Sequence, residues 1–564
     1  MLTTNKTGVS RFIENAVKQG MRHVVCSPGS RNAPLVIAID NHPEIETVVV
    51  TDERSAGFIA LGMAQQLDAP VGVVCTSGSA MLNYYPAVAE AFYQCVPLVV
   101  LSADRPAEWV NHGDGQTIVQ RGVYTNHIHS ELDIEEFIRE QDQETFDRKV
   151  VKAFTKATQG WRGPIHFNFP LSEPLYQTVE MDRLHVSAPI QKEGGELTEE
   201  DQKTLKNAWN SSSKRMILCG QMSPNVAVLN ALADLAEDAS VVVLVENTSN
   251  LIHPKFIHCI DRTLSAISEE EIDTFQPDLL ITIGGAIISK RIKKFLRNAP
   301  IQNHLKIGFD FPETDTYRKL TATIKCDPSL FLKAIPAINE MQHVSQFGWK
   351  WKQKDFLIQE RMPAFIENAP YSDLTVFDVV LDSIPDNAYL HMGNSSVVRY
   401  GQLFDPIKSI RYFANRGTSG IDGSTSTAVG ASIIRKNELH VMISGDLSFF
   451  YDSNAFWNNA VGENLRIIVI NNGGGGIFRI IDGPNSTSQL DHYFETENRA
   501  SVEGLCQTYE MKYLSAKDLE AVEKQMELLL TMDTQGRPAV LEIYTPNIDN
   551  AVVLKNFFNH FKSS

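Results

Sequence analysis

The sequence predicts an α/β protein with three doubly wound domains, each built on a mainly parallel sheet. Short apolar runs rich in Val and Ile recur along the chain and alternate with helical patterns, which is typical of strand–helix–strand units. Many of these runs contain no polar residue, as expected for strands covered by helices on both faces. The 564 residues also exceed a single core, because domains average about 150 residues.

We assign residues 1–185 to the first domain, with strands predicted at residues 23–25, 47–50, 71–75, 98–102 and within 163–170. The runs 47–50, 71–75 and 98–102 are uninterrupted and β-branched, so we expect them to be buried on both faces. The polar stretch 191–201 holds two glycines and five acidic residues, which predicts a linker.

The second domain is assigned to residues 195–340, with strands predicted at 216–219, 240–245, 279–283 and 306–309. The pattern weakens over 342–353, where we expect a second connection. The third domain is assigned to residues 355–564, with strands predicted at 388–391, 409–413, 439–444, 465–470 and 539–543. The first and third domains share length and rhythm, which suggests two related domains that flank the second.

Composition excludes several classes of function. The net charge of −17 argues against binding to nucleic acid or to an anionic membrane. The most apolar long window, 87–103, is interrupted by Glu90, Gln94 and Pro97, and the amino terminus lacks an apolar signal core. Seven cysteines without a C-x-x-C motif predict reduced thiols. We therefore expect a cytoplasmic protein with small-molecule partners.

Two polar motifs follow neighbouring predicted strands of the third domain. Gly445-Asp446-Leu447-Ser448 comes after 439–444, and Asn471-Asn472-Gly473-Gly474 comes after 465–470. Parallel strands present their carboxyl ends on one edge, where ligands bind. The Asp446 carboxylate, the Asn472 amide oxygen and the Gly474 carbonyl are hard ligands that leave room for phosphate and water around Mg²⁺. A helix from Asp452 to about Glu463 is expected between the motifs. The alternative is two unrelated turns.

Glu53 directly follows the strand predicted at 47–50 and opens a helical pattern. Its carboxylate therefore faces the same kind of sheet edge. One interpretation is a functional acid–base group. The other is a solvated acid in the first turn of a helix, where the helix dipole favours negative charge.

Six cationic side chains lie beside strand ends or glycine turns, although the chain is acidic overall. They are Arg31, Arg105, Lys290, Arg291, Arg399 and Arg416. Each one alone is compatible with an ordinary surface position. Together they indicate a substrate pair that carries several carboxylates, because guanidinium groups pair with carboxylates through two hydrogen bonds.

These motifs resemble one enzyme family closely. The Gly-Asp…Asn-x-Gly pattern is shared by thiamine-diphosphate (ThDP) enzymes. The blocks Ser27–Leu35, Ser102–Pro106, Asn415–Gly423, Gly445–Ser448 and Asn472–Phe478 resemble the 2-succinyl-5-enolpyruvyl-6-hydroxy-3-cyclohexene-1-carboxylate (SEPHCHC) synthases of menaquinone biosynthesis. The resemblance extends over essentially the whole chain, and the second domain contributes little to it beyond Lys290-Arg291.

The resemblance implies a ThDP-enzyme architecture and a transferase that uses ThDP with Mg²⁺, or with Mn²⁺ as the alternative ion. It implies decarboxylation of 2-oxoglutarate and addition of the resulting succinyl-semialdehyde carbanion to isochorismate. It makes Glu53 the partner of the aminopyrimidine and catalytic base, and it assigns the metal ligands Asp446, Asn472 and Gly474. It also implies a homodimer or dimer of dimers, in which opposing subunits share each site.

Further cofactor-binding residues implied by the resemblance are Gly420, Ile421, Leu447 and Ser448. The implied substrate-binding residues are Ser30, Arg31, Arg105, Gln116, Lys290, Arg291, Ser395, Arg399, Arg416, Ile477 and Phe478. The sequence departs from the family pattern at Gly473–Gly476, where four glycines precede Ile477. Glycine is conformationally permissive, so we expect a loosened loop at Ile477 and Phe478.

Two alternatives remain open. A pyruvate-using ThDP enzyme, such as an acetolactate synthase, handles a monocarboxylate and has no need of this arginine set. Simple decarboxylases commonly use active-site histidines, and His127 and His129 have no evident partner in the sequence. A non-catalytic nucleotide-binding scaffold is the other alternative, since fold alone does not fix function. It predicts no dependence on ThDP.

Overall fold

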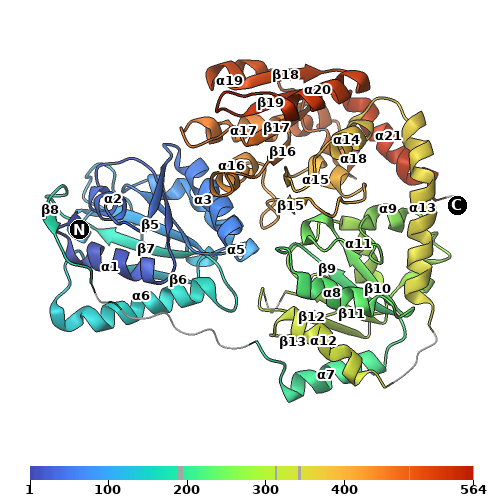
Figure 1. Ribbon diagram of the computed structural model, residues 1–564, viewed down its shortest axis with the longest axis horizontal. Helices are drawn as coiled ribbons and strands as arrows, with labels where there is room; N and C mark the ends of the chain where they lie inside the picture. Colours follow the sequence, from blue (N-terminus) through green and yellow to red (C-terminus); the bar gives the residue numbers. More distant parts are fainter. Residues whose placement is uncertain (185, 187–194, 312–313, 341–344, 482, 563–564) are drawn as a thin grey trace.

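The computed structural model describes residues 1–184, 186, 195–311, 314–340, 345–481 and 483–562. Three parallel sheets lie in successive parts of the chain, with helices packed against them (Figure 1). The predicted α/β fold class is therefore confirmed. The three sheets fall within the predicted segments 1–185, 195–340 and 355–564, whose boundaries remain a prediction. Among the described residues, no helix is both long and apolar enough to span a bilayer.

The N-terminal sheet has six parallel strands in the order β3-β2-β4-β5-β7-β6. Its strands are β2 (His23–Cys26), β3 (Glu46–Val49), β4 (Val71–Cys75), β5 (Leu98–Asp104), β6 (Ser130–Asp133) and β7 (Ile165–Pro170). Its helices are α1 (Thr7–Lys18), α2 (Ala33–Asp40), α3 (Glu53–Leu67), α4 (Ala80–Asn83), α5 (Tyr85–Gln94) and α6 (Gln143–Thr158). A small antiparallel pair joins β1 (Leu2–Thr4) to β8 (Thr178–Glu180).

One burial prediction for this sheet was wrong. Strands β4 and β5 are buried along their whole length, as expected. Strand β3 is an edge strand that is only partly covered, and Val49 is 61% exposed. A β-branched run alone does not show whether a strand has a neighbour on both sides, because edge and central strands share that composition.

The central sheet has five parallel strands in the order β10-β9-β11-β12-β13. The strands are β9 (Arg215–Cys219), β10 (Val241–Val245), β11 (Leu279–Ile283), β12 (Asn303–Ile307) and β13 (Ala322–Ile324). The helices are α7 (Glu199–Asn210), α8 (Val226–Leu235), α9 (Ile260–Ser265), α10 (Ile272–Phe275), α11 (Lys290–Asn298) and α12 (Pro328–Ile338).

Both predicted connections are shorter than expected where the structure describes them. Residues 191–194 and 341–344 lie outside the described residues. Glu199–Asp201 form the first turn of α7, where the Thr198 side chain and Asp201 make a reciprocal capping box. The helix α13 (Phe347–Asn368) occupies most of the second connection. Polar composition therefore hid a capped helix start, because capping residues are also turn residues.

The C-terminal sheet has six parallel strands in the order β15-β14-β16-β17-β19-β18. The strands are β14 (Tyr389–Met392), β15 (Arg411–Phe413), β16 (His440–Gly445), β17 (Leu465–Asn471), β18 (Lys512–Ala516) and β19 (Ala539–Tyr544). The helices are α14 (Asp373–Asp382), α15 (Ser396–Gly401), α16 (Ser424–Ile434), α17 (Asp446–Tyr451), α18 (Ile477–Ile480), α19 (Val502–Thr508), α20 (Leu519–Thr531) and α21 (Asn547–His560).

The N-terminal and C-terminal sheets have the same topology. In each, the spatial order of the strands by chain position is second, first, third, fourth, sixth, fifth. The chain reverses its direction of growth between the first and third strands, and open α/β sheets bind ligands at such a point, outside the carboxyl ends. The prediction that two related domains flank a third agrees with this topology.

The helix expected from Asp452 to about Glu463 is absent. Helix α17 instead begins at Asp446, directly at the end of β16, and a 3₁₀ turn covers Ser453–Phe456. The stretch that follows, Trp457–Gly462, contains two asparagines and a glycine, which disfavour a helix. The crossover is therefore shorter and lies closer to the strand end than predicted.

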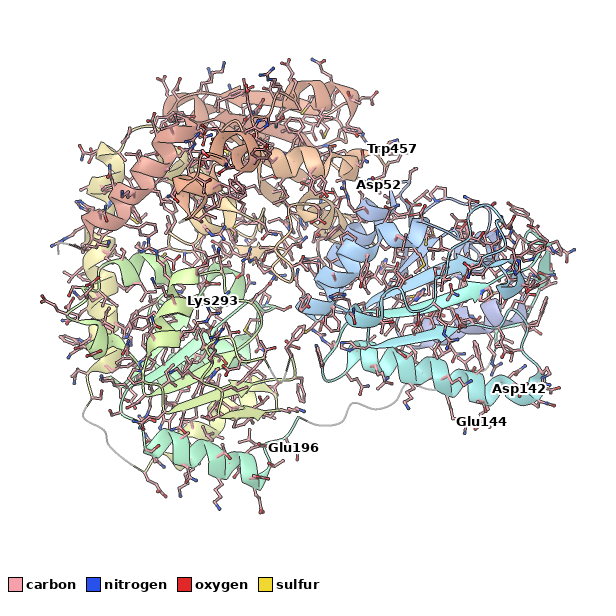
Figure 2. The ribbon with its side chains drawn as sticks, turned by 180° about the vertical axis from the view of Figure 1, so that it is seen from behind. Asp52, Asp142, Glu144, Glu196, Lys293 and Trp457 are labelled. Atoms are coloured by element: carbon pink, nitrogen blue, oxygen red, sulfur yellow. The ribbon has the colours of Figure 1, made fainter. Side chains whose placement is uncertain are left out.

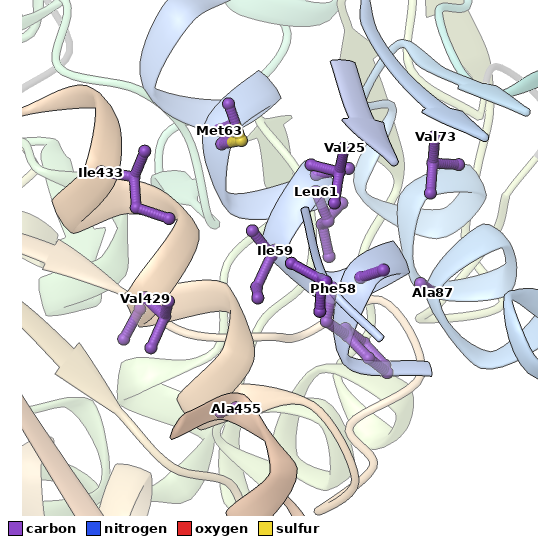
Figure 3. Packing of buried hydrophobic residues seen from close by; sticks show 14 of the residues in the cluster. Val25, Phe58, Ile59, Leu61, Met63, Val73, Ala87, Val429, Ile433 and Ala455 are labelled. Carbon is purple, nitrogen blue, oxygen red and sulfur yellow. The ribbon is translucent and has the colours of Figure 1, made fainter. Parts of the chain in front are cut away.

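Helices α3 and α16 join the N-terminal and C-terminal sheets at very close range (Figure 3). A Cβ built on Gly62 would lie 2.0 Å from the Thr427 carbonyl oxygen, and one on Gly430 would lie 2.0 Å from the Ile59 carbonyl oxygen. Glycine is thus required on both helices. Each helix follows the second strand of its own sheet, so equivalent elements meet face to face.

Candidate functional site

Asp446 lies at the carboxyl end of β16 and is the first residue of α17. It is 2% exposed, and its Oδ2 atom has no hydrogen-bond partner among the described residues. Burial raises the pKa of Asp446 to about 6. A buried carboxylate oxygen without a partner is costly, and a bound cation is the usual way to satisfy it.

Asn472 follows β17, the next strand of the same sheet, and is also buried. Its amide nitrogen donates a hydrogen bond of 3.4 Å to Asp373 Oδ2, whereas its Oδ1 has no partner among the described residues. Asp373, at the start of α14, also accepts 2.6 Å from Thr545 Oγ1. Burial raises the pKa of Asp373 to about 6. The amide is therefore oriented with its nitrogen on a carboxylate and its oxygen free.

The backbone conformation and the close neighbours of the run after Asn472 favour glycine at Gly473 and Gly474. Gly473 has φ +82°, and a Cβ on Gly474 would lie 2.7 Å from the Glu495 carbonyl oxygen. The Gly474 carbonyl accepts 3.0 Å from the Gly476 amide, which leaves its second lone pair. The run leads into α18, where Ile477 is buried and Phe478 packs on Phe494 with ring centroids 5.7 Å apart.

The loop over 415–423 is tied to three other segments. The Asn394 side chain donates to the carbonyls of Asn415 (2.7 Å) and Gly420 (2.6 Å). Ser448 Oγ donates 2.9 Å to the Ile421 carbonyl. Glu90 of α5 accepts from the amides of Gly417 (2.7 Å) and Thr418 (2.6 Å). The loop that carries Gly420 and Ile421 is therefore joined to α17, which carries Asp446, Leu447 and Ser448.

Glu53 is the first residue of α3 and is half-buried. Its Oε2 accepts 3.4 Å from Asn83 Nδ2, and burial raises the pKa of the carboxyl above its ordinary value. Its neighbours Asp52 and Arg54 contact the C-terminal domain: Asn454 Nδ2 donates 2.6 Å to Asp52, and Arg54 donates 2.7 Å to the Tyr451 carbonyl. Figure 2 shows Asp52 near Trp457, where the two domains meet. Glu53 thus differs from a freely solvated helix acid.

The N-terminal substrate set comprises Ser30, Arg31, Arg105 and Gln116. Arg31 follows β2, is 6% exposed, donates 3.0 Å to the Leu171 carbonyl and lies 3.2 Å from Glu173. Arg105 follows β5 and lies 3.5 Å from Asp114. Burial, and after it the charge of Arg105, lowers the pKa of Arg31. Gln116 has φ +56°, a strained value for a residue with a side chain. Ser30 and Gln116 are exposed.

The second substrate set comprises Lys290, Arg291, Ser395, Arg399 and Arg416. Lys290 and Arg291 open helix α11 and are exposed, and the Arg291 guanidinium lies 3.9 Å over the Phe558 ring. Arg399 donates to the Ser395 carbonyl, and Ser395 has φ +72°. Arg416 donates 2.6 Å to Asn394 Oδ1, while its buried Nε has no partner among the described residues.

Asp261, which is partly exposed, interacts electrostatically with part of the second set. Both Arg291 and Arg399 lower the pKa of its carboxyl, against the larger effect of burial. Among the described residues, no hydrogen bond or ion pair joins the N-terminal set to the second set. The structure therefore brings the predicted cations together in two groups.

Asp373, Glu90 and Glu246 are site-supporting residues that the sequence did not reveal. Glu90 was noted only as an interruption of an apolar window. An acid at the start of a helix or directly after a strand was the available signal for Asp373 and Glu246. That signal is weak, because such acids are most often solvated.

The arrangement fits a bound divalent cation with a phosphate-bearing cofactor. Two buried oxygen atoms without partners, on Asp446 and Asn472, follow adjacent strands β16 and β17. Oxygen ligands of this kind suit Mg²⁺ or Mn²⁺. In the part of the chain that the structure describes, no group of three or more His, Cys, Asp or Glu forms a metal site. The Asp446–Asn472 pair, which we call the metal clamp, needs only one carboxylate.

Comparisons with known proteins agree with this geometry. A family model described as the thiamine pyrophosphate enzyme, N-terminal TPP binding domain, matches residues 6–136. A second, the thiamine pyrophosphate enzyme, C-terminal TPP binding domain, matches residues 392–543.

Three curated relatives carry the name 2-succinyl-5-enolpyruvyl-6-hydroxy-3-cyclohexene-1-carboxylate synthase. The protein of Flavobacterium psychrophilum is 43% identical over 97% of this chain and 98% of its own. That of Porphyromonas gingivalis is 39% identical over 99% and 97%, respectively. That of Bacteroides thetaiotaomicron is 35% identical over 99% of each chain.

Proposed function

This chain belongs to the SEPHCHC synthases, a family of ThDP-dependent transferases of menaquinone biosynthesis, and from that premise we propose how its residues perform the reaction. The substrates are 2-oxoglutarate, which loses CO₂, and isochorismate, which receives the remaining four-carbon unit. One observation supports the site assignment most strongly: the unpaired buried oxygens of Asp446 and Asn472 at adjacent strand ends.

Asp446, Asn472 and the Gly474 carbonyl would hold the divalent ion, Mg²⁺ or Mn²⁺, that accompanies ThDP. Leu447, Ser448, Gly420 and Ile421 would contribute to binding the cofactor. Support comes from the Ser448–Ile421 hydrogen bond, which ties the two cofactor segments together. When bound, ThDP supplies the electron sink for decarboxylation.

Glu53 would hold or release a proton at its carboxyl group beside the aminopyrimidine of bound ThDP, as the catalytic acid–base group. Support comes from its burial, which raises the pKa of its carboxyl, and from its position at a strand end of the N-terminal sheet. The Asn83 amide, 3.4 Å away, fixes the orientation of the carboxylate.

The two cation sets bind the carboxylates of both substrates, with Ile477 and Phe478 as the apolar wall. Because no described contact joins the sets within one chain, we infer that the N-terminal set of one protomer faces the second set of another. A homodimer or a dimer of dimers provides this arrangement. The seven cysteines, all free and buried, support a cytoplasmic location.

The test is direct. Purified protein with ThDP and Mg²⁺ should consume 2-oxoglutarate and isochorismate together and release CO₂. Pyruvate should be a poor substrate, because it lacks the distal carboxylate that an arginine would pair. Equal turnover of pyruvate, or indifference to isochorismate, would favour an acetolactate-synthase-like activity.

A further inference from the structure

We propose that Glu246 is a positioning residue that fixes the substrate-binding cations Lys290 and Arg291. This inference rests on the function proposed above and concerns how one part of the substrate site is held. Glu246 itself touches neither substrate nor cofactor in this account, and it acts through the backbone of the segment 288–291.

Glu246 directly follows β10, at the carboxyl edge of the central sheet, and is 2% exposed. Each of its carboxylate oxygens accepts a backbone hydrogen bond: Oε2 from the Ile288 amide at 2.7 Å and Oε1 from the Ser289 amide at 2.8 Å. Charge-assisted bonds of this length are among the stronger ones in proteins. Both donors immediately precede Lys290 and Arg291, so their backbone has little freedom.

The same segment is fixed from a second side. Ser289 is the N-cap of α11, and its Oγ accepts 3.0 Å from the Ile292 amide. It also donates to Asp261, the partly exposed carboxylate whose pKa is lowered by Arg291 and Arg399 against the larger effect of desolvation. Helix α11, which carries the labelled Lys293 in Figure 2, is thus anchored at its first turn by two acids, buried Glu246 and partly exposed Asp261.

The residue after Glu246 extends this support to the C-terminal domain. The Asn247 amide donates 3.2 Å to Gln402 Oε1, and its side chain donates 3.0 Å to the Gly401 carbonyl. Gly401 ends α15, the helix that carries Arg399. Glu246 and Asn247 therefore link the segment with Lys290 and Arg291 to the helix with Arg399.

The charges around Glu246 agree with a positioning role. Arg416 opposes, and Asp261 adds to, the rise in the pKa of Glu246 that burial causes. Glu246 in turn counteracts the burial-driven fall in the pKa of Lys293. Such a buried acid would be replaced by an apolar residue if packing were its only task, because burying a carboxylate is unfavourable.

The variant Glu246→Gln tests this inference, because it keeps size but removes one acceptor and the charge. A hydrogen bond to a charged group is worth about 10- to 150-fold in affinity. We expect the KM of at least one carboxylate substrate to rise by about tenfold or more, with kcat and ThDP affinity changed by less than about threefold. KM is measured for each substrate separately, and ThDP binding is measured by calorimetry.

Asp278→Asn is the matched control. Asp278 also accepts two backbone bonds in the central sheet, from Ser213 at 3.0 Å and Lys214 at 2.9 Å, but at the opposite edge, before β11. Loss of the Asp278 carboxylate should lower the thermal stability of the protein without raising the KM for either substrate. Should Glu246→Gln fail to fold, Ser289→Ala decides the matter, with an expected KM increase of about tenfold, because the lost hydroxyl donates to the Asp261 carboxylate.

Unchanged KM values in the variant that folds, or equal increases in Asp278→Asn, would overturn the positioning role. Failure of the proposed function is recognised separately, because wild-type protein would then form no product from 2-oxoglutarate and isochorismate.

Discussion

The N-terminal and C-terminal sheets share one strand order but present different chemistry at their carboxyl edges. The C-terminal edge buries oxygen atoms without partners, on Asp446 and Asn472. The N-terminal edge carries half-buried Glu53 and a pair of arginines. Helices α3 and α16 hold equivalent places in the two sheets and pack together. The shared topology places a ligand-binding edge in both sheets. The residues that follow each strand then decide the chemistry of that edge, which we propose to be cation binding in one sheet and proton transfer in the other.

The largest expected effect tests the proton-moving edge. Glu53→Gln keeps size but removes the proton acceptor, and general acid–base groups contribute about 10²–10⁴-fold. Hydrogen–deuterium exchange at C2 of bound ThDP should slow by that range. Glu199, the first residue of α7, is the control for an ordinary first-turn acid, and Glu199→Gln should leave exchange unchanged. An unchanged exchange rate in Glu53→Gln would contradict the catalytic role and favour the alternative that Glu53 is a solvated acid in the first turn of a helix.

The next effect tests the cation-holding edge. Asp446→Ala should lower the affinity for Mg²⁺ and ThDP by about 100-fold or more, because even outer-shell residues are worth about 10- to 100-fold. Asp104 is the matched residue at the N-terminal edge: it is the buried last residue of β5 and accepts 3.0 Å from Asn168. Asp104→Asn should retain ThDP in calorimetry. Retention of ThDP by Asp446→Ala would remove the clamp from this account.

A smaller effect concerns the two cation sets. Arg31→Ala and Arg399→Ala should each weaken kcat/KM by about 10- to 150-fold while ThDP binding stays nearly intact. Arg297, in the last turn of α11, binds the Thr316 carbonyl at 3.0 Å, and Arg297→Ala is the control. Steady-state kinetics with varied 2-oxoglutarate and isochorismate would show whether the sets serve different substrates. Equal losses in all three variants would contradict a specific role.

The last effect concerns stability and not activity, and it separates the two sheets by pH. His391 of β14 and His440 of β16 are buried and hydrogen-bonded at 3.0 Å, whereas the equivalent strands β2 and β4 bury valines. Burial lowers the pKa of His440 to about 4, below its unfolded value of 6.5. The neutral histidine stabilises the fold fully above pH 6.5, and this contribution is lost as the pH falls towards 4.

Protonation of His440 therefore lowers the free energy of unfolding by about 3 kcal/mol at most. Denaturant unfolding of wild type and His440→Phe between pH 7 and 4 measures it, and the variant should show a shallower slope. Hydrogen exchange should open β14 and β16 before β2 and β4 on acidification. Equal dependence of the unfolding free energy on pH in wild type and His440→Phe would contradict the assignment of this effect to His440.

Central strands could be predicted from the sequence, but only three of the six edge strands of the large sheets, β3, β10 and β15, could. Leu279–Ile283 and Val71–Cys75 match their predictions, because strands buried on both faces require continuous apolar runs. The edge strands β6, β13 and β18 were missed, since Ser130–Asp133 and its counterparts have an open side and no apolar run.

The candidate ligands of the site could be proposed from the motifs, but the contacts that support them could not. Asp446 and Asn472 are recognised by residue type after a strand. The orientation of Asn472 by Asp373, 99 positions away, depends on tertiary packing that local patterns do not encode. The same holds for Glu90, which accepts from a loop 327 positions later. Within the four-glycine run, expected to be loose, Gly474 packs tightly: a Cβ there would lie 2.7 Å from the Glu495 carbonyl oxygen.

Mixing two inactive variants tests the central claim. The claim is that the N-terminal sheet edge of one protomer and the C-terminal sheet edge of the opposing protomer together form each site. Glu53→Gln and Asp446→Ala homodimers are dissociated, combined in equal amounts and reassembled. Half of the dimers are then mixed, and each mixed dimer has one intact site, so about a quarter of wild-type activity should return. If both edges of a site came from one chain, every site would keep one lesion. No recovery in fully exchanged dimers would contradict the account.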